Sequence, residues 1–158
     1  MNELKLADRT FSVTRAREDD VPTIVALLRD DVLGAGRESD DLSPYRAAFA
    51  AIDADAAQFL ATVRNEDGEV VATMQLTLIP GLSRAAALRL QIEAVRVARS
   101  ERGTGLGTAI FHWAIEYGRE RGAKLVQLTT DAQRPDARRF YESLGFVASH
   151  VGMKLALD

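Results

Sequence analysis

Apolar residues recur along the chain with two spacings, one typical of helices and one typical of strands. Together with capping and turn signals, these spacings predict the element order β-α-α-β-β-β-α-β-α-β. Strands are expected at about 11–17, 57–64, 69–79, 85–98 and 124–130 and within 146–156, and helices from 21, from 43, at 106–121 and at 135–144.

This order predicts an α+β fold with α/β/α layers and a mixed central sheet. Three consecutive strands form a meander in the middle, and a βαβ crossover follows near the end. No internal repeat, low-complexity tract or Pro/Gly/Ser-rich linker interrupts residues 1–158. We therefore expect a single domain over 1–158, long enough to enclose its own core.

The strand expected at 85–98 changes its apolar face halfway along. The residues before and after the change have opposite parity in the sequence: Leu88, Leu90 and Ile92, then Val95 and Val97. Because a strand keeps one face with a period of two, an extra residue near Glu93-Ala94 explains the slip. The alternative is a strand buried on both faces, where parity has little meaning. We predict a β-bulge here, and bulges often lie beside active sites.

A glycine-rich turn, Arg102-Gly103-Thr104-Gly105-Leu106-Gly107-Thr108, separates this strand from the next helix. Glycines let backbone N–H groups face a ligand, and the helix N-terminus adds the positive end of its dipole. These features predict an anion site with phosphate as the natural guest. The spacing G-x-G-x-G differs from the dinucleotide motif G-x-G-x-x-G, and no Lys follows as a Walker loop requires. A nucleotide-binding oxidoreductase is therefore disfavoured.

Composition excludes several classes of protein. The absence of cysteine excludes a disulfide scaffold, a thiolate metal site and a cysteine nucleophile, and two histidines are too few for a His-rich zinc site, so no metal is expected. The net charge of -3 argues against a nucleic-acid-coating protein. No apolar run approaches the ~18 residues of a membrane span, and the charged start MNELKLADRTF lacks the apolar run of a signal peptide. We therefore expect a cytoplasmic protein with no nucleic-acid or membrane partner.

Charge is distributed unevenly along the chain. Residues 1–58 carry 12 acidic and 7 basic side chains, whereas five arginines cluster within 84–102. A basic stretch inside an acidic protein favours a small anionic ligand over a polyanion.

Two motifs together resemble the GNAT superfamily of acyl-CoA-dependent N-acetyltransferases. The turn Arg102-Gly103-Thr104-Gly105-Leu106-Gly107 matches the family motif (Q/R)-x-x-G-x-(G/A), which follows a bulged fourth strand. A later family helix, roughly A-x-x-F-Y-x-x-L-G-F, is matched by residues 137–146, from Ala137 to Phe146. The resemblance covers the whole core and is most specific over 85–147.

The resemblance implies that acetyl-CoA is the cosubstrate and says where it binds. Its pyrophosphate would lie on backbone N–H groups of the turn, namely those of Arg102, Gly103, Thr104, Gly105, Leu106, Gly107 and Thr108. Its pantetheine arm would lie along the main chain of Val95, Arg96 and Val97, like an added strand. The N–H of Val95 would then donate to the thioester carbonyl.

Acetyl transfer also requires groups that move protons. An amine attacks a thioester only when it is unprotonated. Because alkylamine pKa values are about 10, a base or a water chain is needed. Glu93, at the parity slip, is the candidate base, and partial burial would suit that role. The alternative is that Glu93 only pairs with an arginine such as Arg89.

The resemblance assigns Tyr141 as the acid that protonates the departing CoA thiolate; the alternative is a core aromatic, as expected for Phe140. His150, near the last strand, is interpreted first as a surface histidine and otherwise as lining the acceptor site. Asp131 would either cap the next turn or contact the pantetheine arm, and the sequence does not separate these roles.

The sequence thus predicts an acetyl-CoA-dependent N-acetyltransferase whose acceptor is a small primary amine attacked directly in a ternary complex. Arg37, Arg46 and Arg89 are candidates for contacting an acidic group on the acceptor. The alternatives are acetylation of a protein N-terminus or lysine, and a non-catalytic acyl-CoA-binding domain. The resemblance also makes a homodimer a reasonable expectation.

Overall fold

The computed structural model describes residues 2–31, 35–131 and 135–157. The chain forms two compact units, residues 1–127 and residues 128–158, which we describe separately. The single domain expected over 1–158 stays a prediction.

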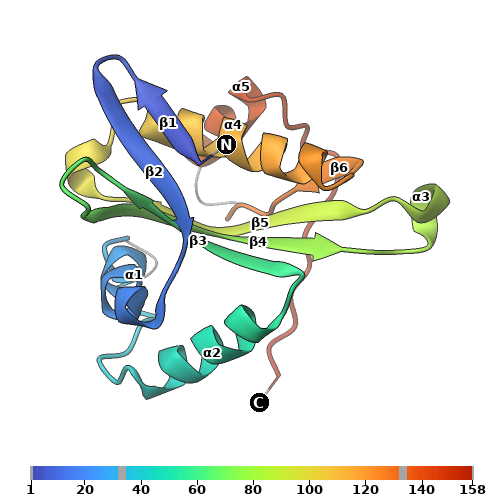
Figure 1. The fold of residues 1–158 in the computed structure, drawn as a ribbon. Coiled ribbons are helices and arrows are strands. Elements are labelled where there is room, and N and C mark those ends of the chain that lie inside the picture. The colour runs from blue at the N-terminus through green and yellow to red at the C-terminus, as the bar shows by residue number, and fades with distance from the viewer. Residues whose placement is uncertain (1, 32–34, 132–134, 158) are drawn as a thin grey trace. The chain divides into compact units, whose positions relative to one another are not determined.

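The first unit contains a six-stranded sheet with the strand order β1-β2-β3-β4-β5-β6 (Figure 1). Neighbouring strands are antiparallel except for the parallel pair β5–β6. The strands are β1 Glu3–Leu6, β2 Arg9–Arg15, β3 Gln58–Arg64, β4 Val70–Ile79, β5 Arg89–Val97 and β6 Leu125–Gln127. The helices are α1 Val21–Arg29, α2 Ser43–Ala54, α3 Ser83–Ala86 and α4 Leu106–Glu120, with short 3-10 turns η1 Glu18–Asp20 and η2 Arg99–Glu101. This mixed sheet with helices confirms the predicted α+β fold class.

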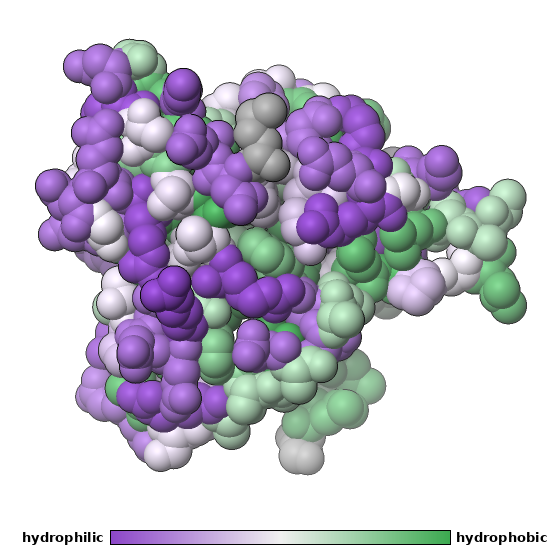
Figure 2. Space-filling model, viewed as in Figure 1, coloured by the Kyte–Doolittle hydropathy of each residue, from purple (hydrophilic) through white to green (hydrophobic). Residues whose placement is uncertain are grey.

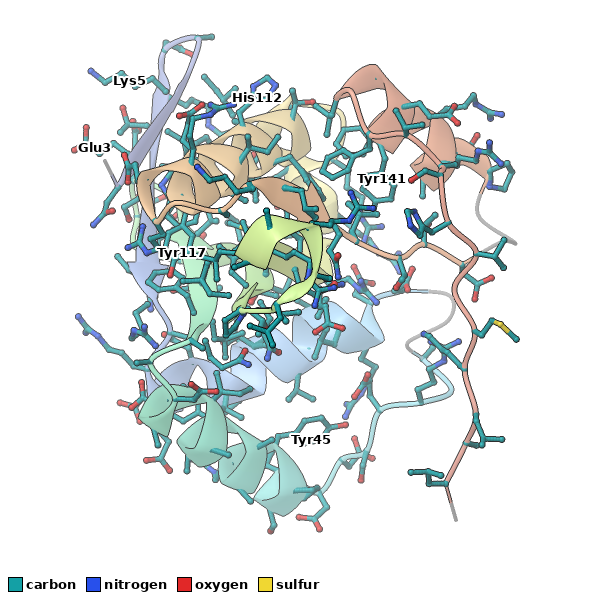
Figure 3. The ribbon with its side chains drawn as sticks, turned by 90° about the vertical axis from the view of Figure 1, so that its right-hand side faces the viewer. Glu3, Lys5, Tyr45, His112, Tyr117 and Tyr141 are labelled. Atoms are coloured by element: carbon teal, nitrogen blue, oxygen red, sulfur yellow. The ribbon has the colours of Figure 1, made fainter. Side chains whose placement is uncertain are left out.

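Helices cover both faces of the sheet (Figure 1). Helix α1 packs on β4 and β5 and α2 on β3, whereas α4 packs on β1, β5 and β6 from the other side. The apolar stripe of α4 explains this position, because Leu106, Ile110 and Ala114 recur at helical spacing and are fully buried. His112 points away from the sheet on the exposed side of α4 (Figure 3).

One glycine brings α4 close to the sheet. A Cβ atom on Gly118 would lie 2.9 Å from Cδ2 and 3.3 Å from Cβ of Leu90 in β5. Glycine is unfavourable inside a helix by roughly 0.5–1 kcal/mol relative to alanine, so its presence here reflects this close approach. The same contact shows that Leu90, and with it Ile92, points toward α4.

The N-terminal region differs from the prediction of one strand at 11–17. The chain forms a hairpin, β1 with β2, in which Ala7 adopts a left-handed conformation with φ 52°. The turn residues Ala7 and Asp8 include no glycine or asparagine, so the strongest sequence signal of a two-residue hairpin is missing.

The β4–β5 connection projects beyond the sheet (Figure 1). Its short helical turn α3 is left-handed, with φ between 55° and 58° at Arg84, Ala85 and Ala86. Leu82 beside it is 95% exposed. Figure 2 shows apolar residues at this projecting end of the molecule.

The second unit contains α5 Pro135–Ser143, close to the helix predicted at 135–144, and a glycine cap follows it. Gly145 has φ 91°, its N–H donates to the Glu142 carbonyl at 3.0 Å, and the Phe146 N–H donates to the Tyr141 carbonyl at 3.1 Å. The rings of Tyr141 and Phe146 lie 6.2 Å apart between centroids and supply the accompanying hydrophobic contact. This pattern is the left-handed glycine cap that ends many helices.

The last strand predicted within 146–156 does not form in the described part of this unit. Alternation of apolar residues marks a strand only when another strand pairs with it, and no strand pairs with 146–157. The apolar side chains of this segment are exposed: Val147, Val151, Met153, Leu155 and Leu157. None of the helices in the described ranges combines the length and apolar character needed to cross a bilayer.

Candidate active site

The predicted bulge in β5 is confirmed. Glu93 pairs with Gln75 and Arg96 with Thr73, so two residues of β5, Ala94 and Val95, lie opposite one residue of β4. Ala94 has φ 52°, the left-handed conformation that bulges often contain. The extra residue lets Glu93 and Arg96 share one face of the sheet although they are three residues apart.

The bulged half of β5 has one unpaired edge. Strand β6 pairs only with Arg89–Gln91, and no strand in the described ranges pairs with Glu93–Val97 on that side. The Ala98 N–H donates to the Val71 carbonyl at 2.8 Å, toward β4. Because main-chain groups alternate along a strand, the N–H of Val97 faces the unpaired edge. This edge can accept an extended ligand as an added strand.

The glycine turn directly follows β5 and η2. Gly103 and Gly105 have φ 78° and 92°, conformations that residues with side chains rarely adopt. Gly105 is the N-cap of α4, and the first intrahelical bond runs from the Ala109 N–H to its carbonyl at 3.1 Å. The first N–H groups of α4 therefore lack intrahelical acceptors, as in other anion-binding helix starts.

Not every N–H of the turn is available to a ligand. The N–H groups of Arg102 and Thr104 donate to the carbonyls of Arg99 and Glu101 at 3.3 and 3.4 Å. The Leu106 N–H is 3.4 Å from the Thr104 hydroxyl. Within the described part of the chain, the remaining N–H groups of the turn have no such acceptor, and they belong to Gly103, Gly105, Gly107 and Thr108.

One carboxylate holds the two arginines that precede the glycines. Asp30, at the end of α1, accepts hydrogen bonds from Nε of Arg99 at 2.8 and 3.0 Å, and its Oδ2 lies 3.3 Å from Nη2 of Arg102. Arg102 also donates to the carbonyls of Asp30 at 3.1 Å and Val97 at 3.2 Å. The hydrogen bonds from Arg99 lower the pKa of Asp30 and raise that of Arg99. The side chain of Arg102 thus fastens the turn to α1.

A second pair joins α1 to the bulge. Nη2 of Arg96 lies 3.3 Å from Oδ2 of Asp31, and both side chains are mostly buried. Nη1 of Arg96 donates to the carbonyl of Val95 at 2.8 Å. Because its side chain is used inside the fold, the guanidinium of Arg96 is not presented to a ligand on the unpaired edge.

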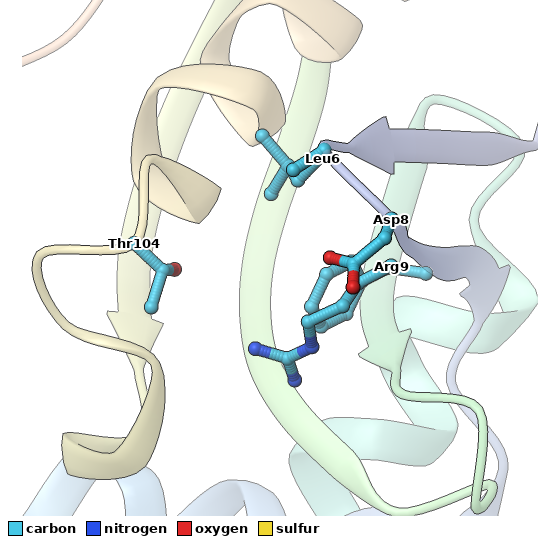
Figure 4. A pocket seen from close by; sticks show the side chains of 6 residues that line it. Leu6, Asp8, Arg9 and Thr104 are labelled. Atoms are coloured by element: carbon cyan, nitrogen blue, oxygen red, sulfur yellow. The ribbon is translucent and has the colours of Figure 1, made fainter.

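Arg9 anchors the other side of the turn. Its guanidinium donates to both carboxylate oxygens of Glu101 at 2.8 and 2.6 Å, and the Glu101 side chain is only 6% exposed. The bond to Glu101 raises the pKa of Arg9. A pocket of about 250 Å³ lies beside Arg9 (Figure 4). Of the predicted site residues it includes only Thr104, and its lining is Leu6, Ala7, Asp8, Arg9, Phe11 and Thr104.

The segment between α1 and α2 is organised around Tyr45. Its hydroxyl donates to Oε2 of Glu38 at 2.6 Å and accepts the N–H of Ser39 at 2.8 Å. The bond to Glu38 raises the pKa of Tyr45. Arg29 donates to the Ser39 carbonyl at 2.6 Å, so the segment before α2 is fastened to the end of α1.

Glu93 lies at the bulge, as predicted, but its side chain is exposed. The expectation of partial burial is therefore wrong, because Glu93 and its neighbour Ala94 are both exposed. Its predicted alternative, an ion pair with an arginine such as Arg89, is absent among the described residues. Exposure leaves Glu93 open to solvent and to an incoming substrate.

Tyr141 lies in the second unit on α5, half-buried, with its ring edge-on to those of Phe140 and Phe146. His150 is exposed and its Nδ1 lies 2.8 Å from the Ser149 hydroxyl. The catalytic role of Tyr141 stays a prediction, as do the alternatives for His150 and Asp131.

Sequence comparison agrees with this geometry. The profile of the Acetyltransferase (GNAT) family matches residues 13–146. An aminoalkylphosphonate N-acetyltransferase of Salmonella typhimurium is 35% identical over 119 residues, which are 74% of this chain and 75% of that protein.

Solved structures show the same fold. A transcriptional regulator from Bacillus halodurans C-125 is 43% identical and has a TM-score of 0.88, with 93% of this chain and 99% of that chain covered. A candidate acetyltransferase from Agrobacterium tumefaciens strain C58 is 32% identical and has a TM-score of 0.80, with 92% of this chain and 99% of that chain covered.

The chain therefore belongs to the GNAT family of acetyltransferases. It is an acyltransferase of the N-acetyltransferase type, and its family uses acetyl-CoA as cosubstrate.

The Asp30 pairs make stability depend on pH. The folded-state pKa of Asp30 lies below its unfolded value of about 3.9, so its contribution is present above that pH and is lost as the pH falls through the lowered pKa. We expect Asp30→Asn to lower the urea midpoint at about pH 6 and to match the wild type near pH 2–3.

The matched control is Asp40→Asn, which removes a carboxylate that pairs with Arg29 at 2.9 Å but is 98% exposed. It should change the midpoint little at any pH. A pH-independent difference for Asp30→Asn would contradict the electrostatic account.

Proposed function

We propose that this protein transfers the acetyl group of acetyl-CoA to the primary amine of a small molecule by direct attack in a ternary complex. The observation that carries the proposal is the unpaired edge of β5, which runs from the bulge at Ala94-Val95 into the glycine turn. An extended thioester has its acyl group and its phosphates at opposite ends, and this edge offers a backbone donor at one end and an anion site at the other.

Acetyl-CoA would bind chiefly through the main chain. Its pyrophosphate would be held by the available N–H groups of Gly103, Gly105, Gly107 and Thr108, aided by the α4 dipole. Its pantetheine arm would lie along Val95–Val97. The main-chain alternation that turns the Val97 N–H toward the unpaired edge applies to Val95 too, so the Val95 N–H would be the donor for the thioester oxygen.

The reaction requires two proton movements. The amine nitrogen attacks the thioester carbon, loses a proton and forms the amide, while the C–S bond breaks and the thiolate takes a proton. We assign the first proton to Glu93, directly or through a water chain, because it is exposed beside the Val95 edge. Tyr141 is assigned as the proton donor to the thiolate, on the strength of its place in the family motif at 137–146.

The chain contains no cysteine, so the acetyl group cannot rest on a protein thiol between two half-reactions. The similarity to an aminoalkylphosphonate N-acetyltransferase supports a small acceptor that carries an amine and an anionic group. Acetylation of a protein N-terminus or lysine is the second candidate, because the acidic first third of the chain would attract a basic protein. The cytoplasmic location and the homodimer stay predictions.

The proposal is tested by CoA release from acetyl-CoA with a panel of amino acids, polyamines, aminoglycosides, aminophosphonates and peptides. We expect thiol release with small amines and intersecting initial-velocity lines, because both substrates must be bound together. Parallel lines would contradict the ternary complex. If acetyl-CoA binds and no amine in the panel is acetylated, the chain acts as an acyl-CoA-binding domain.

Gly105→Ala tests the anion site. Alanine is strained at φ 92°, by about 1–2 kcal/mol, although its Cβ would find space 3.7 Å from Leu6. We expect acetyl-CoA to bind about 10-fold more weakly by calorimetry, since a strain of this size displaces the turn. Gly68→Ala is the matched control, because Gly68 has φ 81° and open space in the β3–β4 hairpin. Equal losses of affinity in both variants would show a general effect of strain.

Tyr141→Phe tests the proton donor. We expect kcat to fall by about 10²–10⁴-fold while the Kd of acetyl-CoA is unchanged, because only the hydroxyl is removed. Phe140→Leu, a change to the neighbouring ring, measures the effect of disturbing α5 and should leave kcat within a few-fold. An unchanged kcat in Tyr141→Phe would remove Tyr141 from the mechanism.

A further inference from the structure

A row of polar side chains crosses the sheet face opposite α4. Gln58 of β3 pairs with Thr77 of β4, Thr77 with Gln91 of β5, and Gln91 with Gln127 of β6. Cross-strand partners share a face, and Leu90 marks the other face through its contact with Gly118. All four row residues are half-buried. Apolar residues normally occupy such positions in a sheet between helices, so this polar row calls for a functional explanation.

Hydrogen bonds fix how the amides of this face are turned. Oε1 of Gln58 accepts Nε2 of Gln75 at 3.0 Å and the Thr77 hydroxyl at 2.8 Å. Oε1 of Gln91 accepts Nε2 of Gln127 at 2.7 Å. Two groups stay available to a ligand in the described structure: Nε2 of Gln91, which is a donor, and Oε1 of Gln75, which is an acceptor.

The available groups differ between the two ends of β5: hydrogen-bond acceptors lie at one end and donors at the other. At the bulge end, Gln75 lies opposite Glu93, so two acceptors, an amide oxygen and a carboxylate, are neighbours. At the other end, Gln91 and Arg89 stand on the same face two residues apart and both present donors. Gln91 is about 7 Å from Glu93 along the strand, a distance that a small molecule can span.

Among the candidate arginines, Arg89 suits a ligand on this face. It is half-buried on the face of the polar row and makes no ion pair within the described ranges. Gly81 is its neighbour, and a Cβ there would make only an ordinary contact with Nη2 at 4.0 Å. Arg46 is already paired with Glu18 at 3.1 Å, and Arg37 lies in the exposed segment between α1 and α2.

We propose that this face is the acceptor subsite and that it selects primary amines carrying a carboxylate or phosphonate a few bonds from the nitrogen. The amine lies at the bulge end, beside Glu93 and Gln75, next to the thioester position. The anionic group lies at the other end, where Arg89 and Gln91 donate to it. This inference rests on the proposed acetyl transfer and adds the chemistry that chooses the acceptor.

The test compares kcat/KM for matched amines: β-alanine and 2-aminoethylphosphonate as anionic acceptors and propylamine as the neutral one. The wild type is expected to prefer the anionic amines. In Arg89→Ala the ratio of anionic to neutral kcat/KM should fall by about 10- to 100-fold, mainly through KM. Arg89→Lys should recover part of this ratio, and the two anionic amines separate carboxylate from phosphonate preference.

Two further variants complete the test. Gln91→Leu should lower the same ratio, although it leaves the charge of Arg89 in place, and it replaces Arg89→Ala if that variant does not fold. Arg84→Ala is the control, since it removes an exposed arginine of the projecting α3 turn.

An unchanged ratio in folded Arg89→Ala and Gln91→Leu, or a wild type that prefers propylamine or peptides, would overturn the subsite. Failure of the proposed function itself looks different, because the wild type would then acetylate none of the amines while still binding acetyl-CoA.

Discussion

The extra residue in β5 is the constraint on which the site depends. A strand without it would keep one face from Arg89 to Val97, and Glu93 and Arg96 would point in opposite directions. With Ala94 and Val95 opposite a single residue of β4, Glu93 stays on the face of the polar row and Arg96 reaches Asp31 on that same side. The bulge therefore sets both the position of the proposed base and the anchoring of the strand to α1. The bulge requires Ala94 to adopt a left-handed conformation, which is unfavourable for a residue with a side chain.

Charge pairs fasten the turn that the bulge leads into. Asp30 and Asp31 stand at the end of α1, where the helix dipole disfavours carboxylates, and each is matched by arginines from the β5–α4 segment. On the opposite side, Arg9 holds the nearly buried Glu101. Because Arg96 and Arg102 work inside the fold, the proposed anion site relies on backbone N–H groups and on the dipole of α4. Three of the five arginines within 84–102, namely Arg96, Arg99 and Arg102, thus serve the fold, which charge counting alone does not reveal.

Features encoded locally could be predicted from the sequence. The parity change from Ile92 to Val95 marks the bulge, and the glycines at 103 and 105 mark a turn that needs positive φ. Features that depend on pairing across the sheet could not be predicted. Asp30 and Arg99 are 69 residues apart in the chain, and the polar row is visible only when the register of four strands is known. The prediction of a last strand was wrong for a related reason, because the alternation of apolar residues at 146–156 does not show whether a partner strand is present.

The contact between Gly118 and Leu90 has a consequence for how α4 works. Gly118 lies twelve residues along the helix from Leu106, which is about 18 Å at the rise of an α-helix. A helix is stiff over that length, so the angle at which its N-terminus meets a phosphate is set partly by how closely its far end approaches the sheet. The glycine therefore helps to set the orientation of α4. A larger residue at this position would change the direction in which the N–H groups at the helix N-terminus point, although it lies far from the anion site.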